Sequence, residues 1–136
     1  MDLKEIFEKY GVAKEYKRGA EIFREGAAAT YALLITEGIV QIAKTRDEKQ
    51  FIVAIRGEGD ILGEMVFEGT PRLANATALS DVKAIYVATE TFRRIIYEEP
   101  DVTMQLFSVL LQRLKQATEQ VGDMALVGVY ERLRKF

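Results

Sequence analysis

The sequence predicts a mainly β domain, a sandwich or barrel of short strands with helices at both ends. Across Glu15–Val87 the apolar residues fall in short runs that glycine or charged residues interrupt. The flanking segments Asp2–Tyr10 and Thr89–Tyr97 instead repeat apolar residues at helical spacing, and a longer helical pattern covers Val102–Val127. Many short strands at regular spacing are typical of β-sandwiches and β-barrels. With 136 residues, the chain is long enough for one compact domain and an appended element.

The elements follow from these patterns in chain order. Asp2–Tyr10 is predicted to be a helix because its apolar residues recur every three or four positions, and Gly11 is placed to end it. The predicted strands are Ala20–Phe23, Tyr31–Ile35, Ile39–Ala43, Phe51–Ile55, Ile61–Leu62, Ala74–Leu79 and Lys83–Val87. The charged stretch Thr45–Lys49 is expected to form the exposed tip of a hairpin.

The C-terminal helical pattern has the spacing of a coiled-coil seam. Pro100 is expected to separate it from the preceding helix, with Asp101 as its cap or first-turn acid. The seam residues recur at steps of three and four: Phe107, Leu110, Leu114, Ala117, Val121 and Met124. A helix over Val102–Val127 would be about 40 Å long at ~1.5 Å per residue, longer than a small barrel covers. We therefore expect a homodimer through residues 102–127, with a helix folded back on its own domain as the alternative.

The composition favours binding over catalysis. There are 19 Lys and Arg against 21 Asp and Glu, a net charge of −2, which does not suggest a domain that mainly grips nucleic-acid phosphates. Cysteine and histidine are absent, so we expect no metal, no haem and no iron–sulfur cluster. No pair of a nucleophile and a general base is visible either, so we expect that the protein is not an enzyme. No apolar run reaches about 18 residues and the N-terminus is charged, which predicts no membrane contact and a cytoplasmic location.

The densest motif is LGEMVFEGTPRLA at residues 62–74. Gly63 permits close approach of the backbone, and Glu64 supplies a carboxylate that accepts hydrogen bonds from hydroxyls. Arg72, eight residues after Glu64, supplies a forked donor that suits phosphate. Together these residues favour a sugar-phosphate site. A surface Glu–Arg ion pair around a tight turn is the structural alternative.

The segment GEMVFEGTPRLANATAL at residues 63–79 resembles the phosphate-binding cassette of cyclic-nucleotide-binding domains, which read G-E-[LM]-A-L and then P-R-[AS]-A-T. The runs YALLITEG at 31–38 and GEGDILGE at 57–64 resemble other motifs of the family, in its order. The closest resemblance is to Crp/Fnr-type, catabolite-activator-like transcription regulators. It implies a jelly-roll (cupin-like) β-barrel sensor at residues 1–100 and a dimerisation helix at 101–128. Residues 129–136 would begin a truncated or missing winged-helix DNA-binding domain.

The resemblance also implies roles for individual residues. Glu64 would accept from the ribose 2′-hydroxyl, and Arg72 would pair with the cyclic phosphate. Main-chain N–H groups at or beside four residues would complete the phosphate site: Gly63, Met65, Leu73 and Ala74. Ile42 and Val53 would lie against the base, and Thr118 would reach it from the helix.

The implied function is an effector-binding and dimerisation domain that binds a cyclic nucleotide, cAMP or cGMP, and relays this through the dimer helix. DNA would be contacted only through a C-terminal domain that this chain lacks. Two alternatives stay open: a dimeric interaction module with a degenerate pocket, and a sensor of a different small anion. Leu73 stands where the family has Ala or Ser, and its bulk would crowd the ligand beside the phosphate. Ala117 lacks a hydroxyl near the expected base position, so weak base selectivity is expected.

Overall fold

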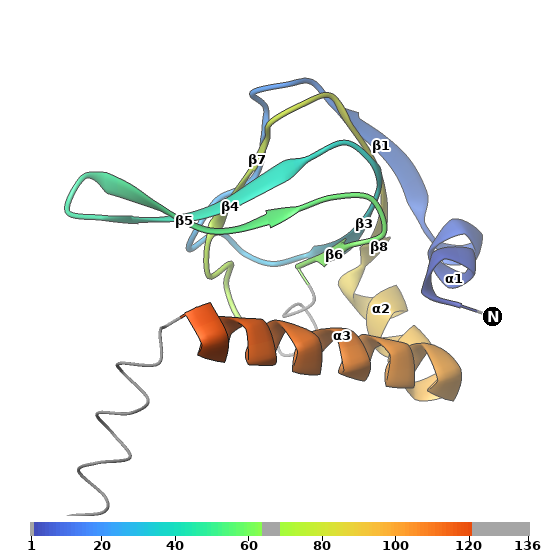
Figure 1. Cartoon of the computed structure of the whole chain (residues 1–136). Coiled ribbons are helices and arrows are strands. Elements are labelled where there is room, and N and C mark those ends of the chain that lie inside the picture. Colours follow the sequence, from blue (N-terminus) through green and yellow to red (C-terminus); the bar gives the residue numbers. More distant parts are fainter. Residues whose placement is uncertain (1, 64–68, 121–136) are drawn as a thin grey trace, which may run out of the picture.

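The computed structural model describes residues 2–63 and 69–120 (Figure 1). The elements in chain order are α1 (Leu3–Tyr10), β1 (Val12–Tyr16), β2 (Glu21–Phe23), β3 (Tyr31–Glu37), β4 (Val40–Arg46), β5 (Lys49–Arg56), β6 (Ile61–Leu62), β7 (Asn75–Ala78), β8 (Val82–Ala88), α2 (Thr89–Glu98) and α3 (Pro100–Gln120).

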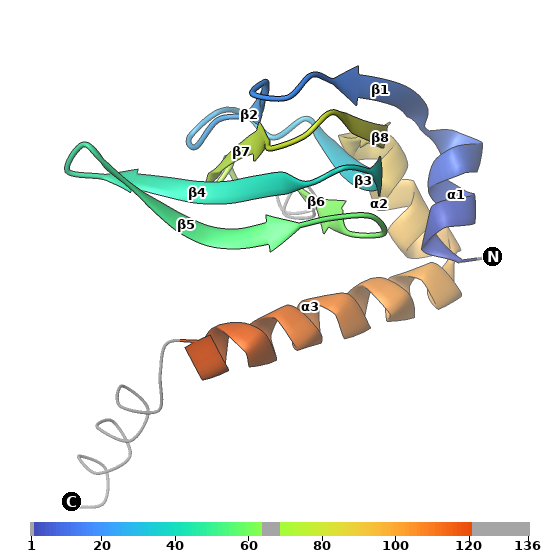
Figure 2. The ribbon, with the colours of Figure 1, turned by 45° about the horizontal axis from the view of Figure 1, so that its top comes forward.

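The strands form two antiparallel four-stranded sheets, with orders β1-β8-β3-β6 and β2-β7-β4-β5. The sheets stack as an open sandwich, from which the β4–β5 hairpin projects (Figure 2). The predicted mainly β, jelly-roll class with a C-terminal helix is confirmed. The strands close into two facing sheets rather than a continuous barrel.

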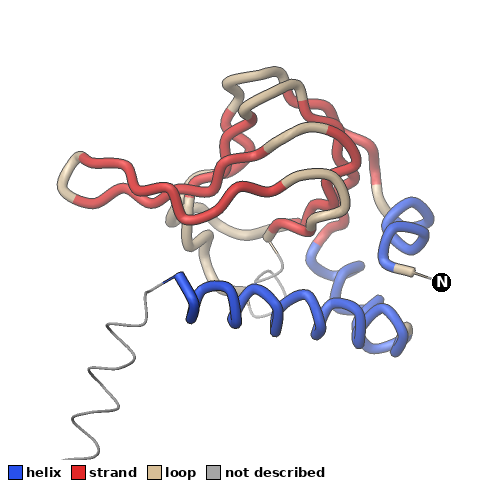
Figure 3. Tube along the Cα trace, viewed as in Figure 1, coloured by secondary structure: helices blue, strands red, loops and turns tan. Residues whose placement is uncertain are grey.

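The sheet β1-β8-β3-β6 is covered on both faces. In β3, Ala32 and Leu34 face a core built with the helices, whereas Leu33 and Ile35 face the second sheet. The helix-side core takes residues from all three helices, which gather beside this sheet (Figure 3). Because both faces are buried, the run Tyr31–Ile35 is apolar without alternation.

Strand β1 is absent from the sequence-based prediction. Its sequence, VAKEY, buries only Tyr16, so it carries neither an apolar run nor an alternating pattern. Its pairing with β8 at the edge of the sheet defines it as a strand. Backbone pairing, unlike burial, leaves no trace in side-chain hydropathy.

The turns largely follow the prediction. Arg46 pairs with Lys49 in the β4–β5 hairpin, and the two residues between them have φ of 53° and 64°. This confirms the predicted tip as a two-residue turn. Glu99 separates α2 from α3, but Pro100 is itself the first helical residue, a position where its missing N–H costs nothing. Asp101 lies in the first turn.

Helix α3 has one face on the domain and one exposed. Val102 and Leu106, in the first two turns of the helix, are buried in the helix-side core. The seam residues Phe107, Leu110 and Leu114 are exposed. Val121 and Met124, like residues 129–136, lie outside the described residues. Within the described part, no helix is long and apolar enough to cross a membrane.

Candidate functional site

Arg72 is the buried charged side chain of the described residues, with 5% of its surface exposed. Its main chain is tied to the turn before β3: the Arg72 amide donates to the Ala27 carbonyl at 2.9 Å, and the Gly26 amide donates to the Arg72 carbonyl at 2.8 Å. These bonds fix the backbone from which the side chain enters the interior. The predicted phosphate-binding residue is therefore built into the fold rather than lying on the surface.

The guanidinium of Arg72 is held by carbonyl groups and aromatic rings. Its Nη2 donates to the Tyr31 carbonyl at 2.5 Å, and its Nη1 donates to the Gly63 carbonyl at 3.5 Å. Its Cζ lies 4.3 Å from the centre of the Phe23 ring and 4.9 Å from that of Tyr31. Both rings are within the range of cation–π attraction.

Gly63 leaves the room that Arg72 occupies. Its φ is +75°, a conformation that favours glycine, and a Cβ there would come under 3.0 Å from Arg72 Nη1 and to 3.2 Å from the Tyr31 carbonyl oxygen. The sequence analysis assigned Gly63 to close approach of a ligand. In the structure the group that approaches it is the guanidinium.

The phenol of Tyr16 adds to the electrostatics of this region. Burial raises the pKa of Tyr16, and the charge of Arg72 opposes that rise. The phenol is therefore neutral at physiological pH and adds no negative charge beside Arg72.

Arg72 lines a cavity of about 290 Å³. Six of the predicted ligand-binding residues line it: Ile42, Val53, Gly63, Arg72, Leu73 and Ala74. They come from β4, β5 and the segments around the motif, so the fold brings together residues more than 30 positions apart in the sequence. Most of the wall is apolar, with charge concentrated at a few side chains.

Three predicted site residues are not placed in this cavity. Glu64 and Met65 lie outside the described residues. Thr118 is exposed on α3, is not among the residues that line the cavities described here, and donates its hydroxyl to the Leu114 carbonyl at 2.9 Å. Their roles stay predictions.

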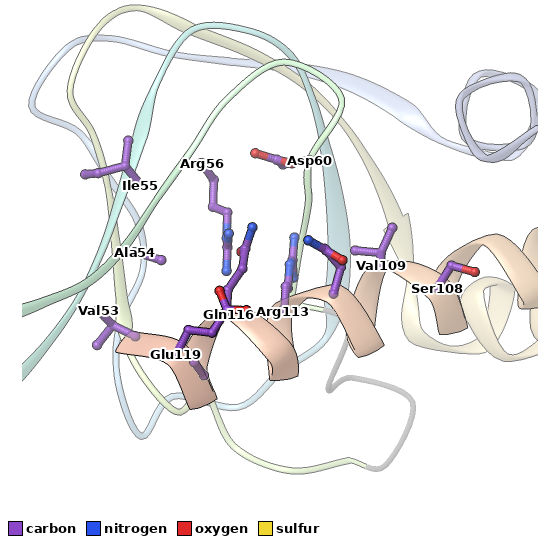
Figure 4. Close-up of a pocket in the computed structure, with 12 residues that line it drawn as sticks. Val53, Ala54, Ile55, Arg56, Asp60, Ser108, Val109, Arg113, Gln116 and Glu119 are labelled. Carbon is purple, nitrogen blue, oxygen red and sulfur yellow. The ribbon is translucent and has the colours of Figure 1, made fainter. Parts of the chain in front are cut away.

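A larger cavity of about 910 Å³ lies between β5 and α3 and shares Val53, Ala54, Arg56 and Arg113 with the first. In Figure 4, Arg56 from β5 and Arg113 from α3 point into the space between strand and helix. Arg113 Nη2 also donates to the Ile61 carbonyl at 2.5 Å, which ties α3 to β6 two residues before Gly63.

The sequence analysis missed several residues that line the smaller cavity: Phe23, Lys44, Arg56 and Arg113. Lys44 was accessible from the pattern, because it stands two positions after the predicted Ile42 on β4. Arg56 was not, because the residue predicted on β5 is Val53, three positions before it, and the pairing of β4 with β5 shifts its register beside Ile42. Among the described residues, no group of three or more His, Cys, Asp or Glu could hold a metal ion.

The chain is similar to known proteins over most of its length. Residues 13–99 match the family model described as "Cyclic nucleotide-binding domain". The CRP-like cAMP-activated global transcriptional regulator of Mycobacterium tuberculosis is 28% identical over 123 residues, which are 89% of this chain and 55% of that protein. The chain thus spans about half the length of this relative.

Solved structures show the same likeness. The Catabolite Activator Protein of Thermus thermophilus superimposes with a TM-score of 0.78 at 25% identity, over 87% of this chain and 56% of that one. The EAL enzyme Bd1971 matches in a cAMP-bound form (TM-score 0.63, 27% identity, 91% of this chain and 33% of that one). Its cGMP-bound form matches with a TM-score of 0.62 and 32% identity, over 76% and 28%.

Proposed function

The chain belongs to the cyclic nucleotide-binding domain family, and from this premise we propose that it is the effector-binding domain of a Crp-type transcription regulator, with cAMP or cGMP as its ligand. The observation that carries the proposal is Arg72, buried in the wall of an otherwise largely apolar cavity. A guanidinium removed from water interacts strongly with an anion, and its planar fork matches two phosphate oxygens.

The cyclic phosphate would lie against Arg72, in the 290 Å³ cavity. Main-chain N–H groups near Gly63, Leu73 and Ala74 would add donors, and Glu64 would accept from the ribose 2′-hydroxyl as the family implies. Ile42 and Val53 would form the wall against the base. Apolar walls accept any flat ring, so cAMP and cGMP would bind with similar affinity.

Signal transfer would run through α3. Phe107, Leu110 and Leu114 form an exposed apolar face on this helix, and a second copy of the helix would cover it in a homodimer. The bond from Arg113 to Ile61 joins the helix to the strand that leads into Gly63. A ligand that moves this segment would thereby shift the packing of the paired helices.

In a complete regulator the paired helices would act on a DNA-binding domain, in keeping with relatives about twice as long. Such a regulator would act in the cytoplasm.

The test is calorimetric titration of the chain with cAMP and cGMP, using Arg72→Gln, Arg72→Lys and the control Arg18→Gln. Arg18→Gln makes the same change of net charge as Arg72→Gln, but Arg18 is exposed and does not line the cavity. Arg72→Gln is expected to lose roughly 2–5 kcal/mol of binding free energy, and Arg72→Lys to recover part of that loss. Equal affinities for Arg72→Gln and Arg18→Gln would contradict the proposal.

A second candidate function is a dimeric module with a degenerate pocket, or a sensor of another small anion. Leu73 favours it, because this bulky side chain lines the cavity beside Arg72. Under this candidate, neither nucleotide binds to the wild type, and Leu73→Ala restores binding if bulk alone closes the site.

A further inference from the structure

The two aromatic rings beside Arg72 come from different sheets. Phe23 is the last residue of β2, in the sheet β2-β7-β4-β5, whereas Tyr31 is the first residue of β3, in the sheet β1-β8-β3-β6. Their ring centres lie 4.3 and 4.9 Å from Arg72 Cζ. The guanidinium therefore sits where the sheets meet, in contact with one ring from each.

The Tyr31 ring is tied to the main chain of β2 and to a second ring. The Tyr31 hydroxyl donates to the carbonyl of Ile22 at 3.0 Å, on the residue just before Phe23. The Tyr31 ring also packs edge-on against Tyr86, with 5.9 Å between the ring centres. Because the Tyr31 hydroxyl bonds to β2 and the guanidinium contacts a ring from β2 and one from β3, its position depends on both strands.

Aromatic rings stabilise a buried cation without neutralising it. Each aromatic face attracts the Arg72 guanidinium through its quadrupole. Because a ring carries no net charge, these two contacts help to place the guanidinium and do not oppose the approach of an anion.

We propose that Phe23 and Tyr31 are positioning residues, which hold the Arg72 guanidinium over their ring faces and thereby set the affinity for the ligand phosphate. This inference rests on the proposed function, because it assumes that Arg72 receives the phosphate. Phe23 also lines the cavity, so the experiment must separate action through Arg72 from direct contact with the nucleotide.

The experiment is titration of the full chain with cAMP and cGMP, with Phe23 replaced by Tyr, by Leu and by pentafluorophenylalanine. The matched control is Phe51→Leu, at an exposed phenylalanine of β5 that does not line the cavity. Phe23→Tyr keeps an electron-rich ring and should bind within about twofold of the wild type. Phe23→Leu should bind about 3- to 30-fold more weakly, the range expected for loss of one cation–π contact.

Pentafluorophenylalanine separates packing from electrostatics, because it keeps the ring but reverses the sign of its face. We expect it to weaken binding at least as much as leucine does, while the unfolding temperature stays near that of the wild type. Wild-type affinity with the fluorinated ring would show that the ring acts by packing or direct contact, and would overturn the inference. The fluorinated and tyrosine variants keep the test decisive if Phe23→Leu does not fold.

The two proposals fail in different ways. If the wild type binds neither nucleotide, the proposed function is wrong and this inference falls with it. If the wild type binds and Phe23→Leu binds as tightly as Phe51→Leu, only the positioning role is wrong.

Discussion

Replacing Gly63 by alanine should reduce ligand affinity far more than it reduces stability. The new Cβ would lie within 3.0 Å of Arg72 Nη1, closer than two such atoms can stay. The far end of a flexible side chain normally yields to such a contact at small cost. Here the yielding group is the guanidinium itself, so the protein would keep its fold and lose the placement of the charge that we propose binds the phosphate.

The Gly63→Ala substitution has two expected free-energy costs, one to stability and one to ligand binding. Gly63 has a φ of +75°, and a left-handed conformation costs a non-glycine residue roughly 1–2 kcal/mol, which should appear as lost stability. Displacing the guanidinium from its ligand should cost roughly 2–5 kcal/mol of binding free energy, as for other disrupted buried charge pairs. The second part should appear in the affinity alone.

Gly59→Ala is the matched control. Gly59 has a φ of +88°, but a Cβ there would meet nothing within 4 Å. Denaturant unfolding of both variants should give similar losses of stability, and calorimetry with cAMP should show a loss of affinity only for Gly63→Ala. If the two variants bind cAMP equally well, the account of Gly63 and Arg72 is refuted.

Three further predictions follow from the structure. Leu114, which is 65% exposed, should lie in the dimer interface, so Leu114→Asp should give a monomer by light scattering. The control Leu79→Asp, at another exposed leucine, should stay dimeric. A wild type that is monomeric at micromolar concentration would contradict this prediction. Calorimetry should find cAMP and cGMP affinities within about tenfold of each other, or ~1.4 kcal/mol. Thr118→Val should change the ratio of the two affinities more than it changes their mean. A wild-type preference beyond about a hundredfold would mean that another side chain reads the base. Burial raises the pKa of Tyr16 above its ordinary value of 10.0, so the folded state holds its proton more tightly than the unfolded state, and stability should fall as the pH rises above 10.0. Tyr16→Phe should flatten that decline in denaturant melts, and an unchanged slope would argue against the effect.

The sequence predicted elements well wherever burial shapes hydropathy. Helix α1, the central strands and the first two turns of α3 all bury a regular set of apolar residues, and all were expected. Strand β1 escaped because it buries only Tyr16 and is defined by its pairing with β8. An edge strand of this kind is defined by its backbone hydrogen bonds, which the hydropathy of the sequence does not show.

Site residues that stand together in one sequence motif were predicted. Site residues that only the folded structure brings together were missed. Arg72 and Gly63 belong to one short motif, which can be recognised in the sequence. The contact of Phe23 with Arg72 joins residues 49 positions apart, and no local pattern of the sequence marks it. The role of Thr118 in contacting the base was predicted from the family resemblance alone. In this structure its hydroxyl donates a hydrogen bond to the Leu114 carbonyl of its own helix.

The central claim is that the phosphate of a cyclic nucleotide lies at Arg72, in the cavity beside β4 and β5. The measurement that tests it most directly is a crystal structure of the chain grown with cAMP. The account predicts the cyclic phosphate within hydrogen-bond distance of the Arg72 guanidinium, with the base against Ile42 and Val53. Nucleotide bound only in the larger cavity between β5 and α3, away from Arg72, would contradict it.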